Sequence, residues 1–279
     1  MSFLSRLFGK KQDQAPPRDV AALTAPLAVP AVHVVKADAP SRSHFGGAPN
    51  LPSGVSWPEY NGVKLSFLAR LSLQEMQRAQ PFDWLPGTGA LLFFYDMEEQ
   101  PWGFDPKHRG GSAVLHVPDL PEPAGQGDQE PEGSSSLPHR NVDFRRIAVL
   151  PSSARESMDA LGLTEQEADE LCRIEEAPFQ GLPKHQVSGF PVPIQSDAME
   201  LECQLASNGV DCGDPSGYDD PRVPELKPGA ASWRLLLQLD TDDDLGVMWG
   251  DAGTLYFWVE EHRAQAGDFT NTWLILQCG

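Results

Sequence analysis

The stretch LSFLARLSL, residues 65–73, returns in altered form as WRLLLQLDT, residues 233–241. In both stretches apolar and polar side chains alternate with period two, which is typical of a β-strand with one buried face. Both also place a leucine, Leu68 or Leu236, at the same site on the otherwise polar face. The shared parity and the shared exception predict an internal duplication of the chain.

The flanking segments repeat in the same order. Four pairs share residue types: HFGGAPNLP from His44 with HQVSGFPVP from His185, WLPGTG from Trp84 with WGDAG from Trp249, GALLFFYD (89–96) with GTLYFWVE (253–260), and RRIAVL (145–150) with TWLILQ (272–277). Phe93 and Phe257 fall at matching sites of the aromatic segments, and aromatic side chains repeated in this way are expected in the core.

We therefore predict an α+β fold, internally duplicated, with two pseudo-symmetric β-rich halves, antiparallel sheets and short connecting helices. The halves cover about residues 41–150 and about 181–279. A helical link over about 151–180 joins them, because Thr164 and Glu167 have the spacing of a capping box. Within the first half, Asn61–Gly62 predicts a tight hairpin.

Residues 1–40 are predicted to be a disordered segment or linker. They are rich in alanine and proline and lack a helical or strand period, apart from one short extended piece at residues 32–36. The first residues, MSFLSRLFGKK, could form one short amphipathic helix, which predicts at most marginal membrane contact, and a frayed terminus is the alternative.

Composition limits the possible partners. The chain has 279 residues and a formal net charge of −19. A surface this acidic repels phosphate backbones, so nucleic acid is not expected as a partner, whereas a basic protein fits the electrostatic field. The charge could also serve solubility alone.

The four cysteines are scattered, and no apolar run reaches the length of a membrane span, so a cytoplasmic location is expected.

A resemblance adds to this interpretation. The stretches FGGAPNLPSGVSWP, LPGTGALLFFYD, HQVSGFPVPIQSDAMELECQLASNG and WGDAGTLYFWV, with those quoted above, resemble the YwqG-like family, a set of mostly bacterial proteins. The resemblance extends over about residues 45–278. It implies a mixed α+β fold with internal pseudo-symmetry, and it implies no reaction, substrate or catalytic residue.

The candidate binding residues come from three places. His44 and His185 occupy matching sites and could act as acid–base groups or ligands, or could hydrogen-bond their local turns. The polar insertion after residue 195 and the second tryptophan–glycine turn supply the others: Asp197, Glu200, Glu202, Asp211, Asp214, Trp249 and Asp251. Long polar loops on a rigid scaffold often carry binding residues.

No metal site and no cofactor are predicted. Cys203 and Cys212 are structural or, less typically, ligands, because their spacing does not match a zinc site. The acidic run from Asp240 to Asp244 is interpreted as a solvated turn, since the glycine and distal glutamate of a calcium-binding loop are missing.

The sequence contains no local catalytic motif among those of the common hydrolases, nucleotide-binding proteins and metalloproteases. We therefore expect a non-enzymatic cytoplasmic binding protein that presents an acidic surface to a basic protein partner, in the manner of an immunity protein. The alternative is a metal- or ligand-dependent enzyme with its site between the two halves.

Overall fold

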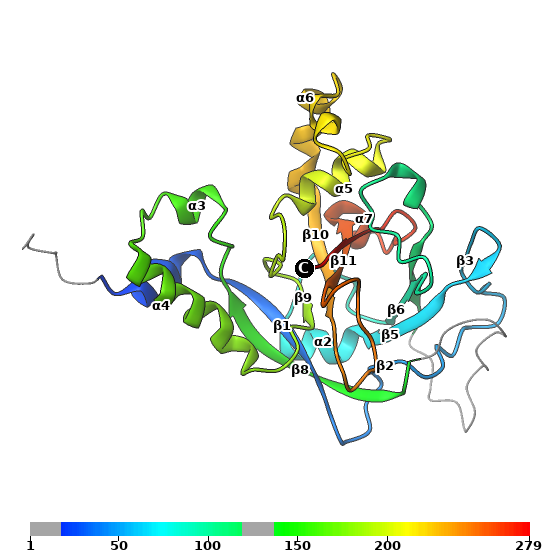
Figure 1. Cartoon of the computed structure of the whole chain (residues 1–279). Coiled ribbons are helices and arrows are strands. Elements are labelled where there is room, and N and C mark those ends of the chain that lie inside the picture. Colours follow the sequence, from blue (N-terminus) through cyan, green and yellow to red (C-terminus); the bar gives the residue numbers. More distant parts are fainter. Residues whose placement is uncertain (1–17, 119–136) are drawn as a thin grey trace, which may run out of the picture.

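The computed structural model describes residues 18–118 and 137–279. In these residues one ten-stranded antiparallel sheet follows the order β12-β11-β10-β9-β1-β8-β2-β5-β6-β7 (Figure 1). Its strands are β1 (Val29–Lys36), β2 (His44–Phe45), β5 (Ser66–Ser72), β6 (Ala90–Tyr95), β7 (Ser112–Val117), β8 (Arg140–Val149), β9 (Gln186–Val187), β10 (Trp233–Asp240), β11 (Thr254–Glu260) and β12 (Trp273–Gln277). The short strands β3 (Glu59–Tyr60) and β4 (Val63–Lys64) form a separate hairpin.

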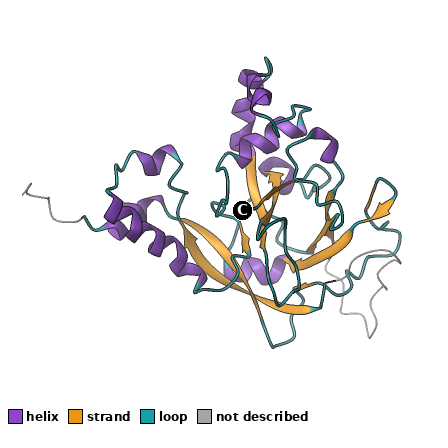
Figure 2. Ribbon diagram, viewed as in Figure 1, coloured by secondary structure: helices purple, strands orange, loops and turns teal. Residues whose placement is uncertain are grey.

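Helices lie beside the sheet and between its halves (Figure 2). They are α1 (Val20–Thr24), α2 (Leu73–Ala79), α3 (Glu156–Asp159), α4 (Glu165–Glu176), α5 (Met199–Ser207), α6 (Val223–Leu226) and α7 (Glu261–Gln265). Thr164 and Glu167 make both hydrogen bonds of the capping box that starts α4. The structure therefore has the mixed α+β composition and the antiparallel pairing that the sequence predicts.

The two ends of the sheet are built alike. The strands β10, β11 and β12 have the same arrangement as β5, β6 and β7, while β9 and β2 connect them to the central pair β1 and β8. The β5–β6 pairing shifts register between Phe67 and Ala69, and the β10–β11 pairing shifts between Leu235 and Leu237. The two irregularities fall at the same place in the stretches 65–73 and 233–241.

Both faces of the strands are covered, which differs from the one wetter face that alternation predicts. Every residue of β5 is buried. The outer face of this end of the sheet packs against Trp57 and Tyr60, around the hairpin at Asn61–Gly62. The outer face of β10 and β11 packs beneath α5, where Trp233 joins an apolar cluster with Cys203. Each half thus adds its own covering segment.

The prediction of a linker over residues 1–40 is wrong for residues 20–24, which form α1, and for residues 29–31, whereas the short extended piece predicted at residues 32–36 is confirmed. Residues 29–36 form β1, which pairs along its length with β8 in the middle of the sheet. Because β1 is covered on both faces, Val32, Val34 and Val35 are all buried and no alternation marks the strand. Residues 1–17, including the possible membrane-binding helix, lie outside the described residues.

The proposed match of residues 145–150 with residues 272–277 is also wrong. Residues 145–149 belong to β8, which pairs with β1, whereas β12 is an outer strand that pairs with β11. The strand in the corresponding position of the first half is β7, which pairs with β6. Its sequence SAVLHV mixes polar and apolar residues, so it does not resemble β12.

The main core contains side chains from both halves. Phe93 of β6 and Phe257 of β11 are fully buried and meet edge to face, with 5.3 Å between their ring centroids. Tyr95 and Trp249 meet in the same way at 6.0 Å. The expectation that Phe93 and Phe257 are core residues is confirmed. Their contact also shows that the sheet curls, because the two strands belong to opposite ends of it.

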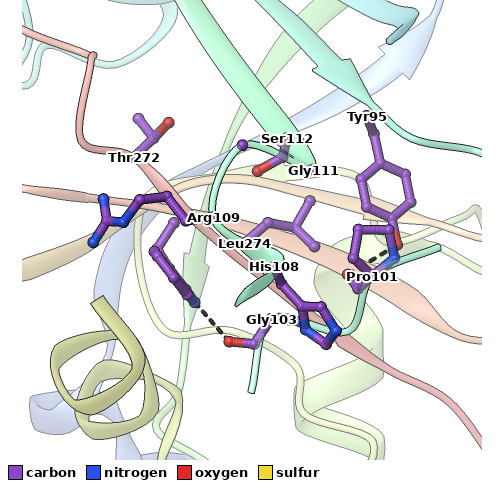
Figure 3. Close-up of a pocket in the computed structure, with 11 residues that line it drawn as sticks. Tyr95, Pro101, Gly103, His108, Arg109, Gly111, Ser112, Thr272 and Leu274 are labelled. Carbon is purple, nitrogen blue, oxygen red and sulfur yellow. Dashed lines mark hydrogen bonds between the residues drawn. The ribbon is translucent and has the colours of Figure 1, made fainter. Parts of the chain in front are cut away.

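The free edge of β12 is covered by the loop between β6 and β7 (Figure 3). The backbone N–H of Leu276 donates to the carbonyl of Trp102 at 3.0 Å, and the indole Nε1 of Trp273 donates to the carbonyl of Gly103 at 2.7 Å. A residual cavity of about 10 Å³ lies there, between Tyr95, Arg109 and Trp273, enough for about one water molecule. Covering the edge protects β12 from pairing with another chain.

Gly103 allows this closure, and replacing it is expected to open the seam. Its φ is +88°, and a Cβ at this position would lie 1.7 Å from the backbone oxygen of Leu274. We expect Gly103→Ala to lower the free energy of unfolding by about 2–4 kcal/mol, as strain and overpacking combine. Chemical denaturation and sedimentation measure the loss and any aggregation. Gly54→Ala is the control, since Gly54 also has a positive φ but open space around it. Equal losses in both variants would contradict the role of the seam.

Candidate functional site

A groove of about 400 Å³ lies where the two halves meet, a volume within the range of ligand pockets. Its aromatic lining residues come from segments that are distant in the sequence: Phe82 and Trp84 follow α2, Phe190 follows β9, Trp233 belongs to β10 and Trp258 to β11. Five of the fourteen lining residues are aromatic, and all of these except Phe190 are buried.

The charges around the groove do not balance. Asp83 is exposed between Phe82 and Trp84, and its carboxylate makes no hydrogen bond or ion pair with a described residue. Arg234 is neutralised by Glu261, with 2.6 Å between Nη2 and Oε2. The other acid in the lining is Glu200. The groove therefore carries a negative charge beside aromatic rings.

Glu200 and Asp197, both predicted binding residues, are held by Arg155 from the helical link. The guanidinium donates to Asp197 at 2.5 Å and 2.6 Å and to Glu200 at 2.8 Å. Burial opposes the charge on Arg155, but the bonds to these carboxylates raise the pKa of its guanidinium. The same guanidinium lies over the ring of Phe190, 4.8 Å from its centroid. The cluster fixes one side of the groove.

Glu202 also belongs to α5 but makes no hydrogen bond to Arg155. It is 2% exposed, its Oε1 accepts a hydrogen bond from Tyr218 at 3.3 Å, and its Oε2 has no partner. Burial raises the pKa of its carboxyl to about 7.

Cys203 and Cys212 are buried free thiols in the same region, and burial raises the pKa of both. Protonated thiols that solvent does not reach are poor nucleophiles. Among the described residues there is no group of His, Cys, Asp or Glu side chains arranged to hold a metal ion.

Four predicted residues take no part in a shared site. The carboxylates of Asp211 and Asp214 accept hydrogen bonds from backbone N–H groups two residues further on, at 2.9 Å each, and so stabilise local turns. Trp249 is fully buried in the main core, where its Nε1 donates to the carbonyl of Asp240 at 3.2 Å. The exposed Asp251 accepts a bond from Gly279 with its backbone oxygen.

His185 belongs to a buried polar cluster. Its Nδ1 accepts the backbone N–H of Asp240 at 3.1 Å, so its Nε2 carries the proton and donates to Asp242, also at 3.1 Å. Asp242 further accepts a bond from Lys36 at 3.2 Å. Burial opposes ionisation of Asp242, but the bond from His185 and the other donors hold the pKa of its carboxyl below the ordinary value. The interpretation of residues 240–244 as a solvated turn is therefore wrong for Asp242, which is 3% exposed.

His44 and His185 do not occupy matching sites, contrary to the sequence alignment. His44 Nδ1 donates to the carbonyl of Gly46 at 2.7 Å, and Gln186 Nε2 donates to that of Ser188 at the same distance. The hydrogen-bond pattern therefore matches His44 with Gln186. Burial lowers the pKa of His44 to about 4, so its ring is neutral at neutral pH.

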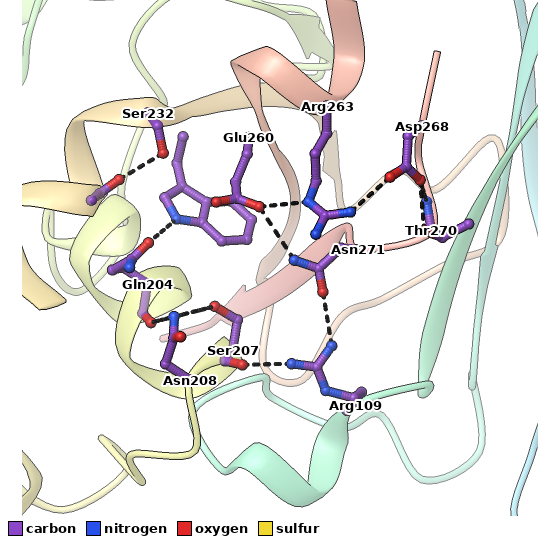
Figure 4. Close-up of polar contacts among 12 residues, drawn as sticks. Arg109, Gln204, Ser207, Asn208, Ser232, Glu260, Arg263, Asp268, Thr270 and Asn271 are labelled. Atoms are coloured by element: carbon purple, nitrogen blue, oxygen red, sulfur yellow. Dashed lines mark hydrogen bonds and ion pairs between the residues drawn. The ribbon is translucent and has the colours of Figure 1, made fainter. Parts of the chain in front are cut away.

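A second polar network joins α5, α7 and the covering loop of β12 (Figure 4). Arg109 donates to Asn271 at 2.9 Å and to the carbonyl of Ser207 at 2.6 Å, and its guanidinium lies 5.0 Å from the ring of Trp273. Asn271 in turn donates to Glu260 at 3.3 Å. These contacts hold the seam together, and none of these residues was predicted from sequence.

Sequence reasoning also missed Phe82, Asp83, Phe190 and Arg155. One local signal was present: in PFDWLP, residues 81–86, an acid stands between two aromatic residues in a proline-bounded loop.

Fold and groove together define a curled antiparallel α+β protein with an aromatic, negatively charged groove between its halves. The chain belongs to the DUF1963 family, a domain of unknown function, whose model matches residues 43–278. The match starts after β1, although β1 lies in the centre of the sheet. No curated protein matches the chain. Within residues 18–118 and 137–279, no helix has both the length and the apolar character needed to cross a membrane.

Proposed function

We propose that the protein is a cytoplasmic binding protein without catalytic activity, and that it presents an acidic surface to a basic protein partner. The observation that carries this proposal is the charge: 40 acidic against 21 basic side chains, a net charge of −19. Such a field attracts a basic partner over long distances and speeds association. Neutralisation of a basic toxin or enzyme, as by an immunity protein, is one concrete form of this function.

The state of the candidate catalytic groups favours binding over the enzyme alternative. Both ring nitrogens of His185 are engaged, which leaves no lone pair to accept a proton from a substrate. Its partner Asp242 belongs to a different cluster from the acids Asp197 and Glu200, which are held by Arg155. An enzyme would need such groups to converge on one reacting atom.

Salt dependence tests the proposal. The full chain is used to capture partners from a native extract at low salt, and each captured protein is identified and eluted in a salt gradient. We expect basic proteins that dissociate as screening increases. A partner that is acidic, or that is retained equally at high salt, would contradict an electrostatic contact.

We also propose that the two halves arose by duplication and that the chain is related to the YwqG-like family. The matched register shifts in β5–β6 and β10–β11 support the duplication, as does the common hydrogen bond of His44 and Gln186. In a duplicated fold, a site between the halves is formed once, where they face each other. The aromatic groove has that location.

A further inference from the structure

We propose that the open edge of β8 binds an extended acidic peptide of a partner protein, which adds to the sheet as one more strand. The inference goes beyond the proposed function and does not depend on it. It starts from a difference in length between two neighbouring strands. β8 has 10 residues, from Arg140 to Val149, whereas β2 beside it has 2.

β8 is paired along the whole of one edge but only at the start of the other. On one side β1 pairs with residues 142–149. On the other side β2 reaches Arg140 and Asn141, and the last contact is the bond from the N–H of Val142 to the carbonyl of Ser43 at 3.0 Å. Beyond Val142, no strand of the described residues lies on that side of β8 (Figure 1).

Two hydrogen bonds show which backbone groups point to the open edge. The N–H and C=O of one residue point to the same side of an antiparallel strand, and that side alternates along the strand. Val142 points toward β2, and the N–H of Phe144 also turns away from β1, because it donates to Asp143 Oδ1 at 2.8 Å. The alternation directs the N–H and C=O of Arg146 and Ala148 to the same edge, where no described residue pairs with them. An incoming extended peptide can pair with these groups.

The open edge is accessible. Arg146 and Ala148 are both exposed, although β8 lies in the middle of the sheet. The helix α2 packs on the strand before this point, where Met76 and Phe144 share the main core. A groove of about 500 Å³ lies beside that contact, lined by Phe144 and by Arg78 of α2. A peptide strand can therefore follow the edge from the groove to the end of β8.

Charge determines which peptide this edge takes. Most lysine and arginine side chains of the described residues are paired with carboxylates, as Arg155 is with Asp197. Arg78, Arg145 and Arg146 are exposed and make no such pair with a described residue. Opposite charges on neighbouring strands attract and like charges repel, so the edge favours an acidic strand. Because successive side chains alternate between faces, two successive acids would meet Arg145 and Arg146 on opposite faces of the sheet.

The acids near this edge do not cancel the arginines. Glu75, in the groove, accepts hydrogen bonds from Ser41 at 3.2 Å and from Ser43 at 2.6 Å, and Asp143 accepts the N–H of Phe144. The net charge of −19 belongs to the whole chain. At physiological ionic strength the exposed charges beyond about 8 Å are largely screened. The nearby arginines therefore dominate the field that a bound peptide experiences.

The test uses the full chain at about 150 mM salt. The probe is the hexapeptide TVEEVT with an N-terminal fluorophore, and fluorescence anisotropy measures its binding. TVKKVT with the same fluorophore is the charge control, which we expect to bind at least about tenfold more weakly. Two further versions of TVEEVT carry N-methyl groups on alternate residues, in one phase or the other. Because only one set of amides faces β8, we expect one version to lose binding and the other to retain it within about twofold.

Variants of β8 test the same edge from the protein side. Ala148→Pro removes one N–H from the open edge and leaves the ladder with β1 intact, a position at which a strand tolerates proline. We expect about tenfold weaker binding of TVEEVT, from the lost main-chain hydrogen bond and the bulk of the ring. Ala148→Val is the matched control, because it keeps the N–H and should bind within about twofold of the wild type.

The charge is tested by Arg145→Gln combined with Arg146→Gln, which should weaken binding about fivefold. Lys227→Gln is the control, since Lys227 is an exposed cation at the end of α6, and it should change binding less than about twofold. Thermal unfolding shows whether each variant is folded. If Ala148→Pro is not, the arginine variants and the N-methylated peptides decide the question.

The inference is overturned if TVEEVT binds no better than TVKKVT, or if Ala148→Pro binds it as well as Ala148→Val does. It is also overturned if methylation in neither phase weakens binding, which is the result expected of a basic surface that only attracts anions. Salt-sensitive capture of a basic partner should be unchanged in all of these variants, so the proposed function stands or fails separately.

Discussion

Replacing Glu202 by glutamine is expected to make the protein more stable at pH 8 by on the order of 3 kcal/mol and to leave its stability at pH 4 nearly unchanged. The carboxyl of Glu202 is 2% exposed, and burial raises its pKa from the ordinary 4.5 to about 7. Glutamine keeps the shape and the neutral state, so that the cost of burying a negative charge disappears.

The direction follows from proton binding. Between pH 4.5 and about 7 the folded protein holds a proton on Glu202 that the unfolded chain has released. The stability linked to this group is therefore fully present below pH 4.5 and is lost as the pH rises through about 7. Two acids of the neighbouring cluster, Glu200 and Asp197, further oppose ionisation, while the hydrogen bond from Tyr218 favours it.

Denaturant unfolding at several pH values between 4 and 9 measures the effect. Glu225→Gln is the control, because Glu225 lies in the neighbouring helix α6 and is exposed. The control should follow the pH profile of the wild type. A Glu202→Gln variant whose stability falls with pH as steeply as that of the wild type would show that Glu202 is already ionised in the folded state.

Local patterns were sufficient where one segment determines its own structure. Alternation located β5 and β10, and Asn61–Gly62 makes the hairpin between β3 and β4 with φ values of +50° and +81°. The strand β1 was predicted only in part, at residues 32–36, because burial on both faces removes the alternation on which such a prediction depends. The strand β7 was not recognised as the partner of β6 because only Val114 and Val117 are buried in it, so its other positions tolerate polar residues and no regular pattern remains.

The site was less predictable than the fold because its members meet only through the curled sheet. Phe82 and Trp258 line the same groove although 176 positions separate them in the sequence.

The wrong match of His44 with His185 has a similar cause. Both turns begin with a histidine in the sequence, but the strand register matches His44 with Gln186, so one residue of offset separates two rings that look equivalent.

The contact between Phe93 and Phe257 is expected to connect the stabilities of the two halves. The two rings meet edge to face across the core, with 5.3 Å between their centroids, and neither is exposed to solvent. Phe93→Ala and Phe257→Ala should each lower the free energy of unfolding by about 3–5 kcal/mol, because each leaves a large cavity. A loss of this size is a substantial part of the total stability of a typical domain.

A double-mutant cycle with leucine separates the ring contact from general burial. Phe93→Leu and Phe257→Leu keep apolar bulk but remove the aromatic pair, so their combined effect should fall short of the sum by about 0.5–1.5 kcal/mol. Phe94 provides the control, because it lies in the outer cluster with Phe67, on the opposite face of β6. Phe94→Leu with Phe257→Leu should be additive. If both cycles were additive, the two halves would not be coupled through this contact, and the groove between them would lack the rigid frame that a preformed binding site requires.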